Sequence, residues 1–599
     1  MFREPPPPLT RAQRILFVVF AIAIAASRIP ALSLTLHDWD ETLFASAVAE
    51  YDVKPHHPHP PGYPLFVLLA KIARLFTDTD FHATQTVAAI GSMLIFPAAF
   101  LLARELRFKP SFAFGAATLT AFLPTLWYYG GTGFSDVPSL AILLFACALL
   151  LRGGRDPRAY VAGALLTAAA CSIRPHLLMI AAVPALLGAM TLRRYKTIIA
   201  SWLAAGAVVV FAYLGAAFFS ADFPHGYLKE LRHIQNHIAK TDSFRNPMRA
   251  PLTELLPRAF LFPWGGRMRN AILALAAIAL IDALIRRRVN VAVLLAMFLP
   301  MAIFTWLMLD VTALSRYAIA YLTLHAFLAV AGVQAITQLL PRRVSLPLFV
   351  ILTAFVTWSL IKWTWPALRF ARTEPSPVVA AFEWIRANVP KDGPRVFVHL
   401  PLVYHAAYFL PDYPYQLVAD EQKWTDEDCV AGNIYVFEGD TQHPDPRWFK
   451  RKRLQLWEVS RPRFFEVGIV AMHRVIRWGP GWHLLESNGH HEWRWMRRQS
   501  LTKLAPALYG RGDLHLKLHA PVDVTQKLPT ITVTWNGAVV DRVTAPQSGD
   551  LDLRYTLPSH TGRPNELRLA TDQYIVPQGD GRELGLSLHA IEWTEPSAR

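Results

Sequence analysis

Cysteine is scarce in this chain, which has 599 residues and only three cysteines. Cys147 and Cys171 lie inside apolar segments, and Cys429 stands alone in the polar half. A disulfide framework needs paired cysteines, and a thiolate metal site needs several of them close together. The sequence therefore excludes a disulfide scaffold and a metal held by thiolates.

Charged residues are also few, at 17% of the chain, whereas hydrophobic residues make up 53% and there are 18 tryptophans. The mean hydropathy is +0.26. This composition is too apolar for a wholly soluble protein and too charged for a wholly embedded one. We therefore expect part of the chain to lie in a membrane and part to form a soluble domain.

Acidic residues are outnumbered, with 44 Asp and Glu against 60 Lys and Arg, giving a formal net charge of +16. A basic patch on a soluble domain would suggest a nucleic-acid partner. Here much of the positive charge lies in short connections between apolar segments, which is the pattern of cytoplasmic loops. We expect no nucleic-acid partner. The basic connections are RELRFK (104–109), RGGRDPR (152–158), TLRRYK (191–196), LIRRRVN (284–290) and PRR (341–343).

Apolar stretches near the roughly 20 residues that span a bilayer begin close to residues 15, 83, 111, 136, 197, 268, 289, 317 and 343. Two shorter stretches, 159–171 and 176–190, are paired as a hairpin. The apolar stretch that begins near residue 15 resembles a signal peptide, but its apolar run continues to Leu36, so we interpret it as a retained anchor. Residues 65–76 are amphipathic and too short to span, which predicts an interfacial helix. We therefore expect about eleven membrane-spanning segments, with the amino terminus in the cytoplasm and the carboxyl-terminal half outside.

The pattern changes after about residue 366. RVFVHL (395–400), QLVAD and NIYVFEGD are typical of strands and predict an α/β domain over 366–495. Alternating segments, with an Asn536-Gly537 hairpin turn, predict a β-sandwich over 496–599. The predicted fold is a polytopic α-helical membrane protein (1–365) with an extracytoplasmic α/β plus β-sandwich region.

A dense group of polar residues follows the first apolar segment. Asp38 and Glu41 have the spacing of an N-cap residue and its N3 partner, so capping accounts for them as well as catalysis does. Asp40 is not needed by that motif. The prolines of the next loop, HHPHPPGYP (56–64), forbid helix and fix an extended path. A rigid loop beside a carboxylate is typical of an active site, and also of a simple external spacer.

These residues resemble the first external loop of the GT-C glycosyltransferases, especially the protein O-mannosyltransferase-like and bacterial undecaprenyl-phosphate-sugar branch. The similarity extends in topology and order over residues 10–365. The matching elements are Asp40-Glu41, His59-Pro60-Pro61-Gly62, GFSDVPS (133–139), SIRPH (172–176) and SRYAIAYL (315–322). The resemblance implies inverting transfer of a monosaccharide from a polyprenyl-phosphate donor to an acceptor hydroxyl at the outer membrane face. Phosphate is a leaving group that needs cations rather than a general acid, so one carboxylate base is sufficient.

The resemblance gives each candidate a role. Asp40 is the expected general base, with Glu41 as its neighbour. Asp136 would be a second acid that positions the acceptor, and an N-cap role explains it comparably well. The candidates for the donor phosphate are Arg316, Arg174 and His59. An arginine at the membrane edge more often reaches lipid phosphate, which is the alternative for Arg316. Further acceptor-binding or supporting candidates are Asp38, His57 and His176.

No cofactor is required by this chemistry, and a divalent metal stays an open alternative. Asp38, Asp40, His56, His57 and His59 are ligand types, but their spacing matches no recognised metal site. In the loop 220–266, a helix-like run with Arg232, His233 and His237 is a candidate cover for the lipid donor. An interfacial helix with a basic face explains that run better.

Three alternatives belong to other classes of function. A lipid-linked-sugar flippase or transporter would place its charges along a path through the membrane. A glycan ligase or oligosaccharyltransferase would use much the same site. A non-catalytic sugar-binding scaffold would not need the acidic pair. Trp535, Tyr555 and Tyr574 are candidate sugar contacts of a carbohydrate-binding-like domain, with core packing preferred for Trp535. The family favours a bacterial plasma membrane and leaves a glycan, a lipid or a protein as the acceptor.

Overall fold

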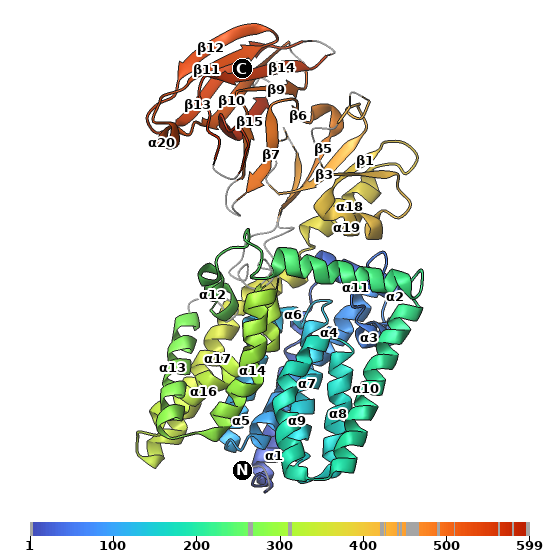
Figure 1. The fold of residues 1–599 in the computed structure, drawn as a ribbon, viewed down its shortest axis with the longest axis vertical. Helices are drawn as coiled ribbons and strands as arrows, with labels where there is room; N and C mark the ends of the chain where they lie inside the picture. Colours follow the sequence, from blue (N-terminus) through green and yellow to red (C-terminus); the bar gives the residue numbers. More distant parts are fainter. Residues whose placement is uncertain are drawn as a thin grey trace. The chain divides into compact units, whose positions relative to one another are not determined.

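The computed structural model describes residues 4–261, 268–309, 314–419, 424–425, 427–439, 443, 446–450, 466–487, 492–507, 510–560, 563–577 and 580–594. Residues 262–266 of the loop 220–266 lie outside the described residues. The chain divides into two compact units (Figure 1). One contains the described residues up to Ser376, and the other contains the described residues from Pro377 onward.

The first unit is built of helices. Prolines open α3, α5, α6 and α8, where the missing N–H leaves no hydrogen bond unmade. The helices are α1 (Arg11–Ala26), α2 (Trp39–Ala49), α3 (Pro64–Arg74), α4 (Asp80–Glu105), α5 (Pro110–Ala121), α6 (Pro124–Tyr129), α7 (Asp136–Arg152), α8 (Pro157–Cys171), α9 (Leu178–Leu192), α10 (Tyr195–Phe218), α11 (His225–His237), α12 (Leu252–Phe260), α13 (Arg269–Ile285), α14 (Val289–Met308), α15 (Leu314–Tyr317), α16 (Leu322–Thr337) and α17 (Arg342–Thr373), with the short turns η1 (Ile29–Ala31), η2 (Pro175–Leu177), η3 (Ile238–Asp242) and η6 (Ala318–Ala320).

Six helical stretches in the described residues are long and apolar enough to cross a membrane, which confirms a multi-pass membrane protein. They are Arg11–Ala31, Asp80–Glu105, Pro175–Leu192, Tyr195–Phe218, Val289–Met308 and Arg343–Asn388. Helices α5, α7, α8, α13 and α16 have 12 to 17 residues, so the count of eleven spans stays a prediction. Helix α3 forms as predicted and is too short to span, with 11 residues.

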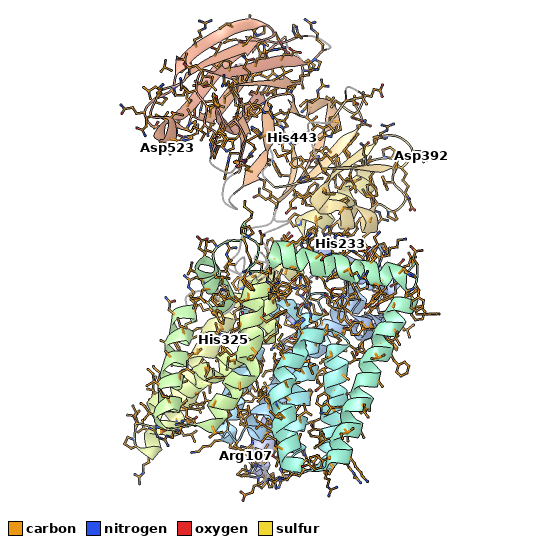
Figure 2. All side chains as sticks on the ribbon, in the orientation of Figure 1. Arg107, His233, His325, Asp392, His443 and Asp523 are labelled. Atoms are coloured by element: carbon orange, nitrogen blue, oxygen red, sulfur yellow. The ribbon has the colours of Figure 1, made fainter. Side chains whose placement is uncertain are left out.

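Arg107, in the basic connection RELRFK, lies at the same end of the helical unit as the amino terminus (Figure 2). Helices α2, α6 and α11 lie at the other end (Figure 1). This connection and the loops that hold the predicted site therefore lie at opposite ends of the helical unit.

Helices α4 and α7 cross closely at Gly91. A Cβ atom at this position would overlap the backbone of Pro138, which lies two residues after Asp136 at the start of α7. Large aromatic side chains fill the core nearby, including the buried Phe96 and Phe100. Gly91 thus fixes how near the first turn of α7 lies to α4.

The second unit begins with an α/β layer. Its central strands β1, β3 and β5 are buried apolar runs, as the sequence predicted. The sheet order is β2-β1-β3-β5-β4, parallel among β2, β1 and β3 and antiparallel from β3 onward. The elements are α18 (Pro377–Asn388), β1 (Val396–His399), η7 (Leu400–Leu402), α19 (Val403–Phe409), β2 (Tyr415–Val418), β3 (Ile434–Glu438), β4 (Arg447–Lys450), β5 (Glu466–Ala471) and η9 (Met472–Arg474).

A β-sandwich follows, with sheets of order β13-β10-β15-β8-β7 and β12-β11-β14-β9-β6. Alternation buries one face of each strand, as with Leu514, Leu516 and Leu518 on β10. The elements are β6 (Arg477–Trp478), β7 (Trp482–Ser487), β8 (Glu492–Met496), β9 (Gln499–Leu504), β10 (Arg511–His519), α20 (Val522–Thr525), β11 (Thr530–Trp535), β12 (Ala538–Thr544), β13 (Asp550–Pro558), β14 (Asn565–Thr571) and β15 (Ser587–Thr594). The hairpin turn at Asn536-Gly537 is present, with φ of 49° and 87°.

Both predicted domain boundaries differ from the structure. The sandwich begins near residue 477 rather than 496, because β6, β7 and β8 pair within its two sheets. Helix α17 continues past residue 365 to Thr373. Both domain boundaries were predicted from where the composition changes. Composition does not indicate which strands pair in a sheet or where a helix ends.

The aromatic candidates of the sandwich have protein partners. Trp535 is a core residue, as preferred: it is 2% exposed, packs on Trp593, and donates to the Pro558 carbonyl at 2.7 Å. Tyr555 donates to Asp541 at 2.9 Å, and the Tyr574 ring lies 4.0 Å from the Arg498 guanidinium. Sugar binding by this domain stays a prediction.

The close crossing at Gly91 gives a direct test of the packing. Gly91→Ala should lower the melting temperature in detergent, because overpacking a tight contact costs about 1–3 kcal/mol. Gly206→Ala on α10 is the matched control, since a Cβ there meets nothing within 4 Å. The control should be neutral or slightly stabilising. Equal melting temperatures for the two variants would contradict the predicted contact.

Candidate active site

The start of α2 is fixed by a capping box. Asp38 is the N-cap residue, and its side chain accepts a hydrogen bond from the Asp40 N–H at 3.2 Å. Glu41, at N3, accepts from the Asp38 N–H at 3.1 Å and from the His37 N–H at 2.7 Å. The capping interpretation of Asp38 and Glu41 is therefore confirmed.

Glu41 also reaches a distant part of the chain. Its second carboxylate oxygen accepts from the Gly133 N–H at 2.8 Å, and the side chain is completely buried. Three backbone N–H groups thus occupy both oxygens. Glu41 links the first turn of α2 to the segment that leads into α7, which is a positioning role rather than contact with a substrate.

Asp136 opens α7 but does not cap it. The N-cap residue is Ser135, whose side chain makes no capping hydrogen bond. One oxygen of Asp136, Oδ2, accepts instead from Arg174 Nη2 at 2.7 Å and from Arg316 Nε at 3.3 Å. The N-cap alternative for Asp136 is therefore wrong, because two arginines occupy its carboxylate.

Arg316 lies on α15 and joins two carboxylates. Its Nη1 is 2.5 Å from Asp40 Oδ2, while its Nε faces Asp136. The guanidinium lies over the Phe134 ring, 4.4 Å from the centroid, and the side chain is only 2% exposed. An arginine that reached lipid phosphate would be exposed at its tip, so the alternative of an interfacial Arg316 is wrong.

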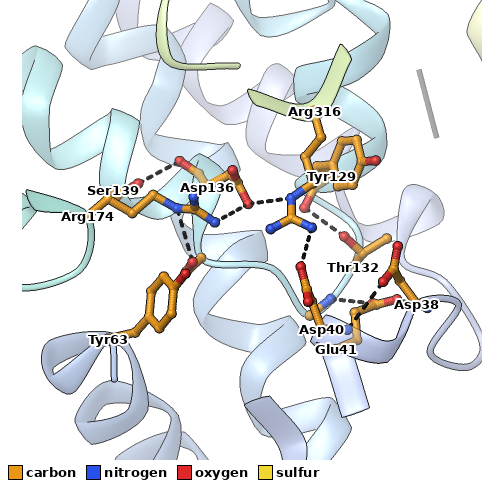
Figure 3. A network of polar contacts seen from close by, with 12 residues as sticks. Asp38, Asp40, Glu41, Tyr63, Tyr129, Thr132, Asp136, Ser139, Arg174 and Arg316 are labelled. Atoms are coloured by element: carbon orange, nitrogen blue, oxygen red, sulfur yellow. Dashed lines mark hydrogen bonds and ion pairs between the residues drawn. The ribbon is translucent and has the colours of Figure 1, made fainter. Parts of the chain in front are cut away.

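Four charged side chains therefore form one buried network (Figure 3). Its members are Asp40 from α2, Asp136 from α7, Arg174 from the turn before α9, and Arg316 from α15. Two carboxylates balance two guanidinium groups. Burial alone would lower the pKa of Arg316, but the charges of Asp136 and Asp40 outweigh burial and raise it, so this arginine stays charged.

His59 lies close to this network. Its Nε2 is 2.7 Å from the Tyr63 hydroxyl, and the Tyr63 ring lies 5.5 Å from the Arg174 guanidinium carbon. Burial is the main cause that lowers the pKa of His59 to about 4. The imidazole is therefore neutral at physiological pH.

The other candidate histidines are placed differently. His57 pairs through its backbone with Asp52, and burial lowers the pKa of its ring. His56 lies 3.7 Å from Glu230 of α11. The His176 ring stacks on that of Phe304 in α14, with the ring centroids 6.5 Å apart. A supporting role for His57 or His176 stays a prediction.

Sequence reasoning missed several residues that hold the site. Tyr63 and Phe134 both contact its arginines, and Ser135 accepts a hydrogen bond from Arg174 Nε at 3.2 Å. All three lie inside the motifs HHPHPPGYP and GFSDVPS. Their adjacency to charged residues was the available signal, but the partners come from distant segments.

Helix α11 packs on the loop that carries His59. Tyr227 is buried against Val53, Ala216 and Ala217, and its hydroxyl donates to the Pro61 carbonyl at 2.9 Å. Tyr227 therefore faces the protein, whereas the neighbouring Leu228 is 46% exposed, and the alternative of an interfacial helix stays a prediction. Arg232, His233 and His237 are exposed on the helix. A role for α11 as a cover over the donor stays a prediction.

The described residues contain no group of three or more His, Cys, Asp or Glu side chains arranged to hold a metal ion. The network carboxylates are instead matched by guanidinium groups. The chemistry that this arrangement offers is therefore proton acceptance by a carboxylate and binding of an anion by arginine.

Glu41 gives a pH-dependent test of the framework. Burial raises its pKa to about 7, although three backbone N–H groups oppose that shift. The folded chain therefore holds this proton more tightly than the unfolded chain, whose carboxyl has a pKa of 4.5. The resulting stability is fully present below pH 4.5 and is lost as pH rises through about 7.

We expect the melting temperature of the wild type, relative to Glu41→Gln, to fall between pH 5 and pH 8. Scanning fluorimetry in detergent measures both proteins at each pH. The glutamine does not titrate, so the change of the difference with pH reports Glu41. Its NH₂ also faces a backbone N–H in place of one carboxylate oxygen, which lowers the melting temperature of the variant by an amount that does not depend on pH. Parallel curves for the two proteins would contradict the prediction.

No family model and no curated protein matches this chain. Among solved structures, the chain is similar to ArnT from Cupriavidus metallidurans bound to undecaprenyl phosphate, at 13% identity, over 77% of this chain and 98% of that one, with a TM-score of 0.47. The apo state of ArnT matches at 13% identity over 76% and 98%, with a TM-score of 0.45. A mycobacterial arabinofuranosyltransferase, AftD, matches at 11% identity over 99% of this chain and 62% of that one, with a TM-score of 0.33.

Proposed function

We propose that this protein is a GT-C glycosyltransferase that transfers a monosaccharide from a polyprenyl-phosphate donor to an acceptor hydroxyl at the outer membrane face. Asp40 is the general base. One observation carries the proposal: Asp40, Asp136, Arg174 and Arg316 form a single buried ionic network at the end of the helical unit opposite the basic connections.

Such a network needs a reason other than stability. Removing charged side chains from water costs several kcal/mol for each ion, and apolar residues of similar volume usually stabilise a fold at least as well. Each of these four residues is at most 9% exposed. Buried charges that are kept in a membrane protein more often serve binding or catalysis.

The two arginines suit the donor phosphate. In the proposed complex, an oxygen of the phosphate competes with Asp40 for the guanidinium N–H groups of Arg316. Charge-assisted hydrogen bonds of this kind stabilise the phosphate as it leaves. The same exchange loosens the bond between Arg316 and Asp40, which makes the carboxylate available to a proton.

The reaction then balances with one base. The acceptor hydroxyl gives its proton to Asp40 while its oxygen forms a bond to the anomeric carbon of the sugar. The bond from that carbon to the phosphate oxygen breaks, and the electron pair leaves with polyprenyl phosphate. Attack opposite to the leaving group inverts the configuration at the anomeric carbon. Asp136 holds both arginines in place during this step.

Asp38 and Glu41 have supporting roles in this scheme. Their capping hydrogen bonds fix the first turn of α2, on which Asp40 lies. His57 and His176 are proposed to contact the acceptor, and that acceptor is a glycan, a lipid or a protein. The proposed location is a bacterial plasma membrane, with the carboxyl-terminal domains outside the cytoplasm.

The principal test removes the base without changing the shape of its side chain. Asp40→Asn should lower sugar transfer by about 10²–10⁴-fold, the usual contribution of a general base. It should bind polyprenyl phosphate at least as well as the wild type, because Arg316 loses a competing carboxylate. The measurement follows release of polyprenyl phosphate from a panel of short-chain polyprenyl-phosphate monosaccharides, using the full-length protein in detergent.

Asp80→Asn is the matched control, since Asp80 also pairs with an arginine, Arg74, at 2.8 Å but outside the network. It should keep full activity. If the wild type releases no polyprenyl phosphate from any donor, yet carries labelled lipid across a liposome membrane, the protein is a transporter. Transfer of a preassembled glycan alone would identify a ligase.

A further inference from the structure

His59 has one polar atom that the protein does not use. Its Nε2 is paired with the Tyr63 hydroxyl at 2.7 Å. Its Nδ1 is buried and has no hydrogen-bond partner among the residues that the structure describes. An unmet buried donor or acceptor costs about 1–3 kcal/mol. A group of this kind beside a candidate active site indicates that a ligand completes it.

The loop around His59 is held from several sides. The Gly62 N–H donates to the His59 carbonyl at 3.1 Å, and the Tyr51 hydroxyl donates to the Gly62 carbonyl at 2.8 Å. The Phe44 ring lies 5.7 Å from the imidazole. These contacts fix the ring before any ligand arrives, so its free nitrogen has a defined direction.

The pairing with Tyr63 selects one tautomer. A neutral imidazole carries one N–H, and burial raises the pKa of the Tyr63 phenol, which therefore keeps its proton. If Nε2 carried the proton, the Tyr63 hydrogen and the Nδ1 lone pair would both lack partners. If Tyr63 donates to Nε2, only the Nδ1–H is unmet. The second arrangement satisfies more groups, so His59 presents a donor at Nδ1.

The surroundings of His59 favour an anion. Among the charged groups, Asp40 acts on it most strongly, and Arg316 and Arg174 together oppose that influence. Arg174 also lies against the Tyr63 ring, 5.5 Å from the centroid. A neutral N–H near two guanidinium groups adds a third donor without adding charge, and these groups together match the oxygens of a phosphate.

We propose that the Nδ1–H of His59 donates a hydrogen bond to an anionic oxygen of the donor phosphate, and that Tyr63 is the positioning residue that fixes this tautomer. The inference rests on the proposed function and adds to it the atom and the proton that make the contact. Tyr63 acts only through His59.

Substituting His59 by Asn or by Gln distinguishes the roles of the two imidazole nitrogens. The side-chain NH₂ of His59→Asn lies near the position of Nδ1, whereas that of His59→Gln lies near the position of Nε2. We expect His59→Asn to bind farnesyl phosphate within about threefold of the wild type. His59→Gln should bind about tenfold more weakly, because a hydrogen bond to a charged group is lost. Titration calorimetry on the full chain in detergent measures both.

Tyr63→Phe tests the positioning role. It should weaken farnesyl phosphate binding severalfold in the wild type but have little effect in the His59→Asn background, because an amide has no tautomer to fix. A purely structural role would weaken binding equally in both backgrounds. His225→Asn, on the exposed start of α11, is the matched control and should leave affinity unchanged.

The outcomes separate this inference from the proposed function. If the wild type does not bind farnesyl phosphate, the proposed function fails and this inference fails with it. If the wild type binds and both amides bind equally well or equally poorly, only the role of Nδ1 is overturned. A loss with His59→Asn and not with His59→Gln would assign the contact to Nε2.

Discussion

Arg316 and its two carboxylates are the contact on which the candidate site depends. One guanidinium group joins Asp40 of α2 to Asp136 of α7, and Asp136 in turn holds Arg174 from the turn between α8 and α9. Segments far apart in the chain are brought to one place by these ion pairs. Because each partner is buried, removing any one of them would leave the network with an excess of one charge in a medium of low dielectric constant. The helix ends around the network therefore form one cooperative unit.

Hydrogen bonds and packing contacts around this ionic network hold its charged side chains in position. Glu41 accepts hydrogen bonds from three backbone N–H groups and connects α2 to the segment before α7. The same side chain therefore helps to position both Asp40 and Asp136. Gly91 permits the close approach of α4 to the first turn of α7. Tyr63 pairs with His59 and also packs against Arg174. The site thus lies on helix ends and turns whose geometry is fixed by the rigid bundle beneath them.

Much of the fold was predictable because the signals were local. Hydropathy over about 20 residues identifies membrane helices, and the spacing of Asp38 and Glu41 identified a helix start that the structure confirms. The sequence left two interpretations open where a residue had a local and a distant explanation. Asp136 has the position of a helix cap but binds two arginines, and Arg316 has the position of an interfacial residue but is buried. The sandwich boundary was missed because β7 and β8 belong to it through long-range pairing.

The sequence by itself determined that the protein is a multi-pass membrane protein, as well as the capped start of α2 and the residue types available for chemistry. Those features follow from short-range periodicity, turn chemistry and charge along the chain. Only the tertiary structure decided which of the charged residues meet. Asp40 and Arg316 are separated by 276 positions, and no local pattern reports a pair at that distance. The partnership arises from helix packing, which places the ends of α2, α7 and α15 together and excludes the water that would otherwise solvate each charge separately.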